Sequence, residues 1–491
     1  MKVAVIGLDG ACMDLIEKWA FEGKLPTFAE LIENGCSGRL ESTIPTFTIP
    51  AWNCMTTGMN PGKIGCFSFI QKAPKSYEFK VYTSLVEKEI DIWDILNIYN
   101  KRIFLFNPPH VLTAYKINGY MISGFLNVDE SKYTYPAYLK DKMSKVGFER
   151  DIPDLRELGS LSDKEFSEKH MEITKKQVKT VNTLINDENW DFIFLVLNEL
   201  DRIQHRFWHK RKMVLKHYKN IDKAVKKIIK NLDEYNIFIV SDHGFKDNKK
   251  IFHINEWFIR NGLLAVEKKN KNLIAKLISL LKKPYIVRFV RPVMRTAILR
   301  RIYMNALVQT GRIPVIWNKT KAFSYGSFGQ IYINLKGREP EGVVEEHEYE
   351  KLREWITNEL NKMGMRVYKR EEIYKGKYTK FAPDLVVQTD GDISVVSGRI
   401  GFDIFVEGFG GAHDRLSGTF IACGPDIKEN ETINNAQIYD ITPTILQMFQ
   451  IPLPKNVDGK ILNILKEPKT VKFTNYEPLL IKNKLKRLKK I

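Results

Sequence analysis

Residues 2–10 read KVAVIGLDG, a short apolar run that ends in an acid and a glycine. Three further runs of the same kind follow, KRIFLFN at 101–107, WDFIFLVLNELD at 190–201 and YNIFIVSDHG at 235–244. Amphipathic stretches separate them, and this rhythm predicts a mostly parallel, buried sheet.

The ends of these runs carry the first candidate functional residues. Three of the four runs end in an acid or an acid–histidine pair, namely Asp9, Asp201, and Asp242 with His243. Ligands of open α/β sheets bind in the crevice at the carboxyl ends of the strands. We therefore expect these side chains to meet at one site.

Histidine is scarce, with nine in the chain, and three of them lie near acids. His205 follows Asp201 by four residues, and an Asp and a His at this spacing on a helix face the same way and can share a metal ion. His413 directly precedes an acid. With Asp9, Asp242 and His243 the set offers about six oxygen and nitrogen ligands, enough for two divalent ions, zinc before manganese or iron. Each residue alone has a structural explanation, as a helix cap or a packed histidine.

A threonine-rich, turn-rich loop supplies the remaining chemistry. The stretch TIPTFTIPAWNCMTTGMNPGKIG at 43–65 follows a predicted strand. A hydroxyl nucleophile needs activation, and coordination to a metal ion is one way to lower its pKa.

Taken together and in order, these motifs resemble the alkaline phosphatase superfamily, in its type I phosphodiesterase and nucleotide pyrophosphatase branch. The matching motifs are GLDG with Asp9, FTIPAW with Thr48, NELDRIQH with Asp201 and His205, SDHG at 241–244, GGAHD at 410–414 and YDITPT at 439–444. The resemblance implies that Asp9, Thr48, Asp242 and His243 hold one metal ion, and that Asp201, His205 and His413 hold the other. It also implies in-line attack by Thr48 on phosphorus, giving a phosphothreonine that water then hydrolyses. Thr43, Thr46, Thr56 and Thr57 are rival hydroxyls, but only Thr48 stands before x-Pro as in the family pattern.

The resemblance also implies an α/β fold, an alkaline-phosphatase-like sandwich around a mostly parallel sheet with an inserted α+β cap. We expect the catalytic core in 1–265 and 380–465, the cap in 266–379, and a basic C-terminal tail in 466–491. Within the cap, strands are expected at 322–344 and a helix at 345–363, and the strand-like run at 381–392 is expected to return to the central sheet.

The substrate contacts are less defined by the sequence. Classical nucleotide pyrophosphatases have an asparagine about twenty residues after the nucleophile, and the ungapped equivalent here is Phe69. Asn53, Lys63 or a backbone N–H could take its place, and Arg338 in the cap either contacts substrate or pins a turn. The expected substrate is a phosphate ester, such as a nucleotide derivative or a lipid-linked phosphoester. A phosphomonoesterase or a phosphoglycerate-mutase-like enzyme is the alternative, whereas a sulfatase is disfavoured because no Cys-x-Pro-x-Arg segment surrounds the nucleophile.

The charge of the chain is +19, with 77 Lys and Arg against 58 Asp and Glu. Residues 268–301 and 482–491 combine Lys or Arg with Leu and Ile at helical spacing, as helices on an anionic membrane surface do. A solvated helix face that covers an apolar groove explains the same pattern. A non-catalytic membrane-surface binding module is therefore the hypothesis from a different class. Specific nucleic-acid binding is not expected, because no basic motif is interleaved with aromatic residues.

The N-terminal run has neither a long apolar segment nor a small-residue cleavage site, and we interpret it as a strand. No apolar run approaches the roughly 18 residues that a membrane span needs. A cytoplasmic location, peripheral to the membrane if the basic segments bind lipid, is the expectation.

Overall fold

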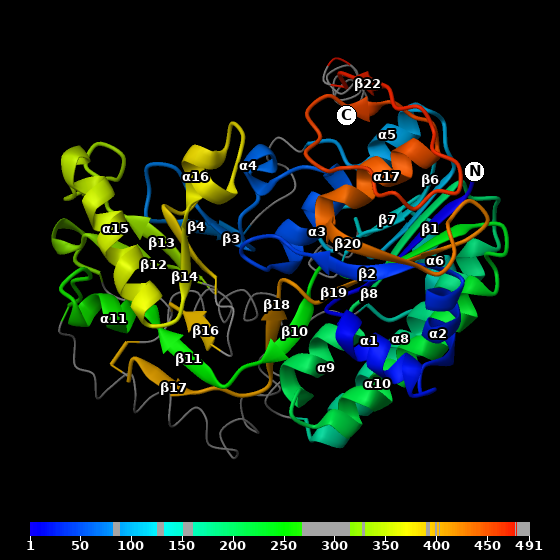
Figure 1. Cartoon of the computed structure of the whole chain (residues 1–491), viewed down its shortest axis with the longest axis horizontal. Helices are drawn as coiled ribbons and strands as arrows, with labels where there is room; N and C mark the ends of the chain where they lie inside the picture. The colour runs from blue at the N-terminus through cyan, green and yellow to red at the C-terminus, as the bar shows by residue number, and fades with distance from the viewer. Residues whose placement is uncertain are drawn as a thin grey trace.

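The four apolar runs form neighbouring strands of one nine-stranded sheet in the computed structural model of the chain (Figure 1). They are β1 (Val3–Leu8), β5 (Ile103–Phe106), β8 (Phe192–Leu197) and β9 (Asn236–Val240). The sheet has the order β20-β2-β19-β9-β1-β8-β5-β6-β7, and β9, β1, β8, β5 and β6 run parallel to one another. The other strands are β2 (Gly35–Glu41), β6 (Gly119–Ile122), β7 (Thr134–Tyr135), β19 (Gly418–Cys423) and β20 (Glu431–Gln437). The predicted mostly parallel sheet is confirmed.

The structure describes residues 1–81, 89–124, 132–150, 161–267, 315–326, 329–388, 393–397, 400–401, 403–476 and 478. The two basic segments, 268–301 and 482–491, lie outside these residues, so membrane contact through them stays a prediction. In the part of the chain that is described, no helix is long and apolar enough to span a bilayer.

Both faces of the central sheet are buried. Successive side chains of a strand point to opposite sides of the sheet, and here each side meets its own apolar core. On β1, Val3 and Val5 belong to one apolar core, and Ala4, Ile6 and Leu8 belong to another. The first face is covered by α3 (Thr48–Thr57), α5 (Ile92–Ile98) and α17 (Ile441–Met448). The second is covered by α1 (Met13–Phe21), α2 (Pro26–Glu33), α6 (Leu139–Lys145), α8 (Asp163–Ile185), α9 (Glu199–Phe207) and α10 (Arg211–Ile229). The result is the α/β sandwich predicted from the sequence.

A smaller unit lies beyond one end of this sandwich and has its own apolar core (Figure 1). It contains one four-stranded sheet, in the order β12-β13-β15-β14, and one three-stranded sheet, in the order β16-β11-β17. The strands are β11 (Lys250–His253), β12 (Ala322–Ser324), β13 (Gln330–Ile333), β14 (Arg366–Lys369), β15 (Leu385–Gln388), β16 (Ile393–Val396) and β17 (Phe405–Glu407). The helices are α11 (Ile254–Arg260), α15 (Glu346–Lys362) and α16 (Arg370–Ile373). Strands at 322–344 and a helix at 345–363 were expected from the sequence, and both are present.

The strand expected to return to the central sheet from 381–392 does not do so. Instead β15 pairs antiparallel with β13 and β14 inside the smaller unit, with Leu385 opposite Ile331 and Val387 opposite Val367. A buried apolar run shows that a segment is a strand, but it carries no information about which of two sheets it joins.

Two short strands connect the smaller unit to the sandwich. β10 (Gly244–Asp247) follows β9, and it pairs antiparallel with β18 (Gly411–Asp414), which precedes β19. The remaining short elements are α4 (Pro61–Ile64), β3 (Ile70–Lys72), β4 (Phe79–Val81), β21 (Leu453–Pro454) and β22 (Phe473–Thr474), with single 3-10 turns at Trp317–Lys319, Thr379–Phe381 and Ile438–Asp440. The ladder between β10 and β18 therefore stands where the chain crosses between the two units.

Candidate active site

The carboxyl ends of three adjacent strands bring the predicted acids together. β1 lies between β8 and β9, with Leu8 opposite Leu197 and Gly7 opposite Val240. Asp9 follows β1 directly, Asp242 and His243 follow β9, and Asp201 lies in the first turn of the helix after β8. Because the three strands are parallel and in register, the residues after their ends emerge at one edge of the sheet.

The first ligand group consists of Asp201, His205 and His413. Asp201 Oδ1 lies 3.3 Å from the Nε2 atom of each histidine, and the two Nε2 atoms are 3.0 Å apart. His205 is on the same face of α9 as Asp201, one turn later, whereas His413 comes from β18. Ligands bound about 2.0–2.1 Å from a tetrahedral zinc ion lie roughly 3.3 Å from one another. The three atoms therefore have the spacing of three corners of a zinc tetrahedron.

The glycines of GGAHD allow β18 to approach α9 this closely. Gly410 has a φ of +68°, and a Cβ atom added there would lie 1.9 Å from the backbone oxygen of His205. A Cβ atom on Gly411 would lie 2.8 Å from Phe245 and 2.9 Å from the backbone oxygen of Gln204. Glycine at 410 and 411 thus sets the distance between His413 and His205.

We expect Gly410→Ala to weaken both the fold and metal binding, because β18 must move away from α9 to accept the methyl group. Gly262→Ala is the matched control, since Gly262 has a similar φ of +67° and no atom within 4 Å of an added Cβ. The control should lose about 1 kcal/mol of unfolding free energy through backbone strain alone, and Gly410→Ala roughly 1–3 kcal/mol more. Urea unfolding and calorimetric zinc titration measure the two effects. Equal losses in both variants, with unchanged zinc affinity, would refute this role of the close contact.

The second ligand group consists of Asp9, Asp201 and His243. His243 Nε2 lies 3.7 Å from Asp9 Oδ1 and 3.2 Å from Asp242 Oδ2. Asp242 is held in place through its other oxygen, which accepts a hydrogen bond from the N–H of Gly10 at 3.1 Å. The rings of His243 and His413 stack with their centroids 3.6 Å apart, so the two groups lie side by side. Asp201 belongs to both.

Each of the three histidines has its proton on the nitrogen that faces away from the carboxylates. The Nδ1 atoms of His205, His243 and His413 lie 3.2, 3.1 and 3.0 Å from the backbone oxygens of Gly411, Gly244 and Thr46. A carbonyl oxygen only accepts hydrogen bonds, so each Nδ1 must donate. An imidazole that donates from Nδ1 has its lone pair on Nε2 in its neutral form, which is the arrangement of metal-ligating histidines whose other nitrogen donates to a backbone carbonyl.

Buried ligand atoms without partners show that these residues fit divalent cations. Within the described residues, Oδ1 of Asp9, Oδ1 of Asp201, Oδ2 of Asp242 and Nε2 of His243 are buried and accept no hydrogen bond. Buried polar atoms in folded proteins nearly always have partners. Two imidazole lone pairs that face each other, as those of His205 and His413 do, also repel unless a cation lies between them.

The electrostatics of the cluster lead to the same conclusion. Burial raises the pKa of Asp9 and of Asp242 well above the ordinary range, and for Asp9 the neighbouring Asp242 and Asp201 add to the rise. Burial lowers the pKa of His243 and of His413. Burial alone would also raise the pKa of Asp201, but His205 and His413 beside it hold that pKa well below its usual value. Crowded buried carboxylates next to neutral imidazoles are an environment that divalent cations stabilise.

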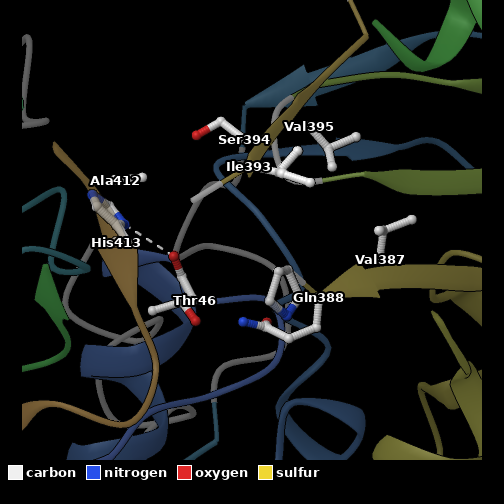
Figure 2. A pocket seen from close by; sticks show the side chains of 9 residues that line it. Thr46, Val387, Gln388, Ile393, Ser394, Val395, Ala412 and His413 are labelled. Atoms are coloured by element: carbon white, nitrogen blue, oxygen red, sulfur yellow. Dashed lines mark hydrogen bonds between the residues drawn. The ribbon is translucent and has the colours of Figure 1, made fainter. Parts of the chain in front are cut away.

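Thr48 begins α3, the helix that packs against β1, the strand that precedes Asp9. Trp52, one turn after Thr48, covers Gly7, where a Cβ atom would lie 2.4 Å from the indole ring. The hydroxyl of Thr442 on α17 donates to the backbone oxygen of Met55 at 2.6 Å and holds the other end of α3. The hydrogen bond from His413 Nδ1 to Thr46 O ties the loop before Thr48 to the first ligand group (Figure 2).

The rival hydroxyls differ from Thr48 in having partners within the protein. Thr43 donates to Pro45 O and Thr57 to Asn53 O, while Thr56 donates to the buried carboxylate of Asp91 at 2.7 Å. Thr46 is 3.4 Å from Thr43 O, a weak bond. Among the described residues the hydroxyl of Thr48 has no hydrogen-bond partner, although the side chain is only 5% exposed.

The family model of type I phosphodiesterase / nucleotide pyrophosphatase matches residues 3–401. The chain belongs to this family. It is therefore a phosphohydrolase of the alkaline phosphatase superfamily, as the ordered motifs predicted. A search of curated proteins finds no matching sequence.

Solved structures give the same fold for this family member. Murine ectonucleotide pyrophosphatase / phosphodiesterase 5 is similar with a TM-score of 0.54 at 13% identity, over 92% of this chain and 96% of that chain. A structure of an inactive form of that enzyme in complex with AMP has a TM-score of 0.54 at 12% identity, with the same coverage. Phosphonoacetate hydrolase from Sinorhizobium meliloti 1021, in complex with phosphonoformate, has a TM-score of 0.57 at 14% identity, over 90% of this chain and 94% of that chain.

Asn53, Lys63 and Arg338 were expected as candidate substrate contacts, and each has a different environment in this family member. Asn53 is buried inside α3, five residues after Thr48. Lys63 Nζ binds Asp458 Oδ1 at 2.5 Å and Asn456 O at 2.7 Å, so its charge is paired within the protein.

Arg338 forms hydrogen bonds to both oxygens of buried Asp384, at 2.6 and 2.7 Å, and a third to Ile333 O. Of the two roles open from the sequence, these bonds fit the one in which Arg338 pins a turn of the cap. Phe69 stacks edge-on against Phe47 at 5.8 Å and offers no hydrogen-bond donor.

Two features of the site were missed by sequence reasoning. The sequence did not show that Asp201 belongs to both ligand groups, because the order of the motifs assigns each residue to a single ion. The pocket beside His413 was also missed, because β15 was expected in the other sheet. Gly410 and Gly411, directly before the segment with His413, could have indicated that β18 lies close to another backbone segment.

Proposed function

We propose that this chain is a metal-dependent hydrolase that cleaves a phosphodiester or pyrophosphate bond through a covalent phosphothreonine at Thr48. The observation that carries the proposal is the convergence of two largely buried ligand groups, with carboxylate and imidazole atoms that lack partners among the described residues, next to the loop that leads into α3. Family membership supports the same class of reaction.

The donor set names the residues that would hold the ions. Asp201, His205 and His413 would hold one, and Asp9, Asp242 and His243, with Asp201 next to them, would hold the other. Two imidazoles with a carboxylate suit zinc, and manganese and iron also accept such ligands. When bound, the ions neutralise charge on the phosphoryl oxygens and lower the pKa of a coordinated hydroxyl.

The protein itself positions the nucleophile and the anion. Thr48 Oγ1 passes its proton to water and forms a bond to phosphorus as the bond to the leaving ester oxygen breaks, and the leaving oxygen takes up a proton from water. The first N–H groups of a helix have no partner within the helix and favour negative charge, so the start of α3 suits the transferred phosphoryl group. This supplies a backbone donor where the family asparagine is replaced by Phe69. Water then attacks phosphorus and releases Thr48.

A nucleotide derivative or a lipid-linked phosphoester is the proposed substrate, and the AMP complex of the murine relative supports the former. Hydrolysis of a phosphomonoester or phosphonate is the second candidate. Two observations favour it, namely Phe69 at the asparagine position and the fold similarity to phosphonoacetate hydrolase.

A hydrolysis screen tests the proposal. Purified protein loaded with zinc or manganese should cleave aryl phosphodiesters or dinucleotides faster than aryl phosphomonoesters, and elemental analysis should find two ions per chain. Faster cleavage of monoesters would transfer the assignment to the second candidate. Neither turnover nor a stoichiometric pair of ions would be the result for a non-catalytic binding module.

A further inference from the structure

A small pocket separates the smaller unit from the first ligand group. Its walls come from the loop before α3, from β15 and β16 of the smaller unit, and from β18 (Figure 2). Thr46 and His413 form the wall nearest to the first ligand group. Thr46 precedes Thr48 by two residues, and His413 belongs to the ligand group itself. The cavity volume is about 20 Å³, enough for a water molecule or the tip of a ligand group.

The amide of Gln388 points into this pocket without a partner. Gln388 ends β15, is only 7% exposed, and extends its amide toward Thr46 on the opposite wall (Figure 2). No described residue forms a hydrogen bond with that amide. By contrast, the buried amides of Gln204, Gln330 and Gln447 donate to the backbone oxygens of Gly10, Phe67 and Lys469. The pocket reaches this amide, so a water molecule or a polar group of a ligand can form the hydrogen bonds that the protein does not supply.

The rest of the lining defines the chemistry of the ligand group. Pro45, Val387, Ile393, Val395 and Ala412 form the apolar part of the walls, and Thr46, Gln388, Ser394 and His413 form the polar part. Apart from His413 no residue that lines the pocket has an ionisable side chain, so neither an ammonium group nor a carboxylate would find a countercharge. An amide both donates and accepts hydrogen bonds, as a hydroxyl group does.

We propose that Gln388 is a specificity residue that binds a hydroxyl group on the organic substituent of the substrate, so that this enzyme prefers esters of neutral, hydroxylated alcohols. The proposal rests on the proposed function, because it assumes that an ester is bound at the adjacent ligand groups. It adds the substrate class that the motifs do not specify.

A matched pair of substrates tests this preference. Both are 4-nitrophenyl phosphodiesters, and the second substituent is 3-hydroxypropyl in one and n-butyl in the other, with equal numbers of heavy atoms. The zinc-loaded wild-type protein should have the higher kcat/KM for the 3-hydroxypropyl ester. Gln388→Leu should lower the ratio of the two kcat/KM values about fivefold or more, because a leucine cannot replace the hydrogen bond.

Two further variants separate recognition from packing. Ile393→Val changes the shape of the same pocket without changing its polarity, and should affect both esters equally. Gln388→Glu introduces a countercharge and should raise the relative kcat/KM for a third ester, whose substituent is 2-(trimethylammonio)ethyl. Thermal unfolding of each variant checks that the fold is retained.

The outcomes distinguish this inference from the proposed function. If the wild-type protein cleaves none of the three esters, the proposed function fails and the inference with it. Cleavage of the first pair with equal kcat/KM values would overturn only the role of Gln388. Ratios that are the same in Gln388→Leu, Gln388→Glu and the wild type would overturn it as well.

Discussion

Asp201→Ala should release both metal ions and lower turnover by a factor on the order of 10³ or more, whereas His205→Ala should release only one ion. The reason is that Asp201 contributes to both ligand groups, and His205 only to the first. Removing Asp201 also deletes a buried negative charge that would balance the cations. Elemental analysis of the purified variants, followed by zinc titration, measures the ions that remain.

The sequence alone assigns Asp201 to a single ion, so this experiment decides between two descriptions of the site. Retention of one tightly bound ion by Asp201→Ala would restore the separate assignment. His205→Ala is the internal control, because the same measurement must report one ion for it under either description. Circular dichroism of both variants verifies that the loss is local.

Thr48→Ala should reduce turnover to roughly a thousandth of wild type or less while leaving metal content close to two ions. Only the attacking oxygen is removed, and the carboxylates and imidazoles of both groups are unchanged. Rapid acid quenching of the wild-type reaction, followed by peptide mass spectrometry, should find phosphate on Thr48 and on no other threonine of α3.

Thr57→Ala is the matched control for this variant. Thr57 lies in the same helix, but its hydroxyl donates to Asn53 O at 2.7 Å, so its loss should cost some stability and little activity. Turnover of Thr48→Ala above about a tenth of wild type would show that the nucleophile is another group.

Most of the site could be predicted from the sequence, because its ligands follow strand ends or lie one helical turn apart. Asp9, Asp242 and His243 could be located in this way, and Asp201 and His205 by their spacing. The placement of β15 could not be predicted, since its apolar pattern fits either sheet. The ion pair between Lys63 and Asp458 could not be predicted either, because the two residues are 395 positions apart and no local sequence pattern indicates their contact.

The hydrogen bonds from the histidine Nδ1 atoms have a consequence for how the site tolerates change. In all three the Nδ1–H donates to a main-chain oxygen, that of Thr46, Gly244 or Gly411. A carbonyl oxygen is present whatever the side chain, so the tautomer of His413 is preserved when position 46 varies. The orientation of the imidazoles is thus encoded in the path of the backbone, and homologues can diverge widely around these ligands provided that this path is conserved.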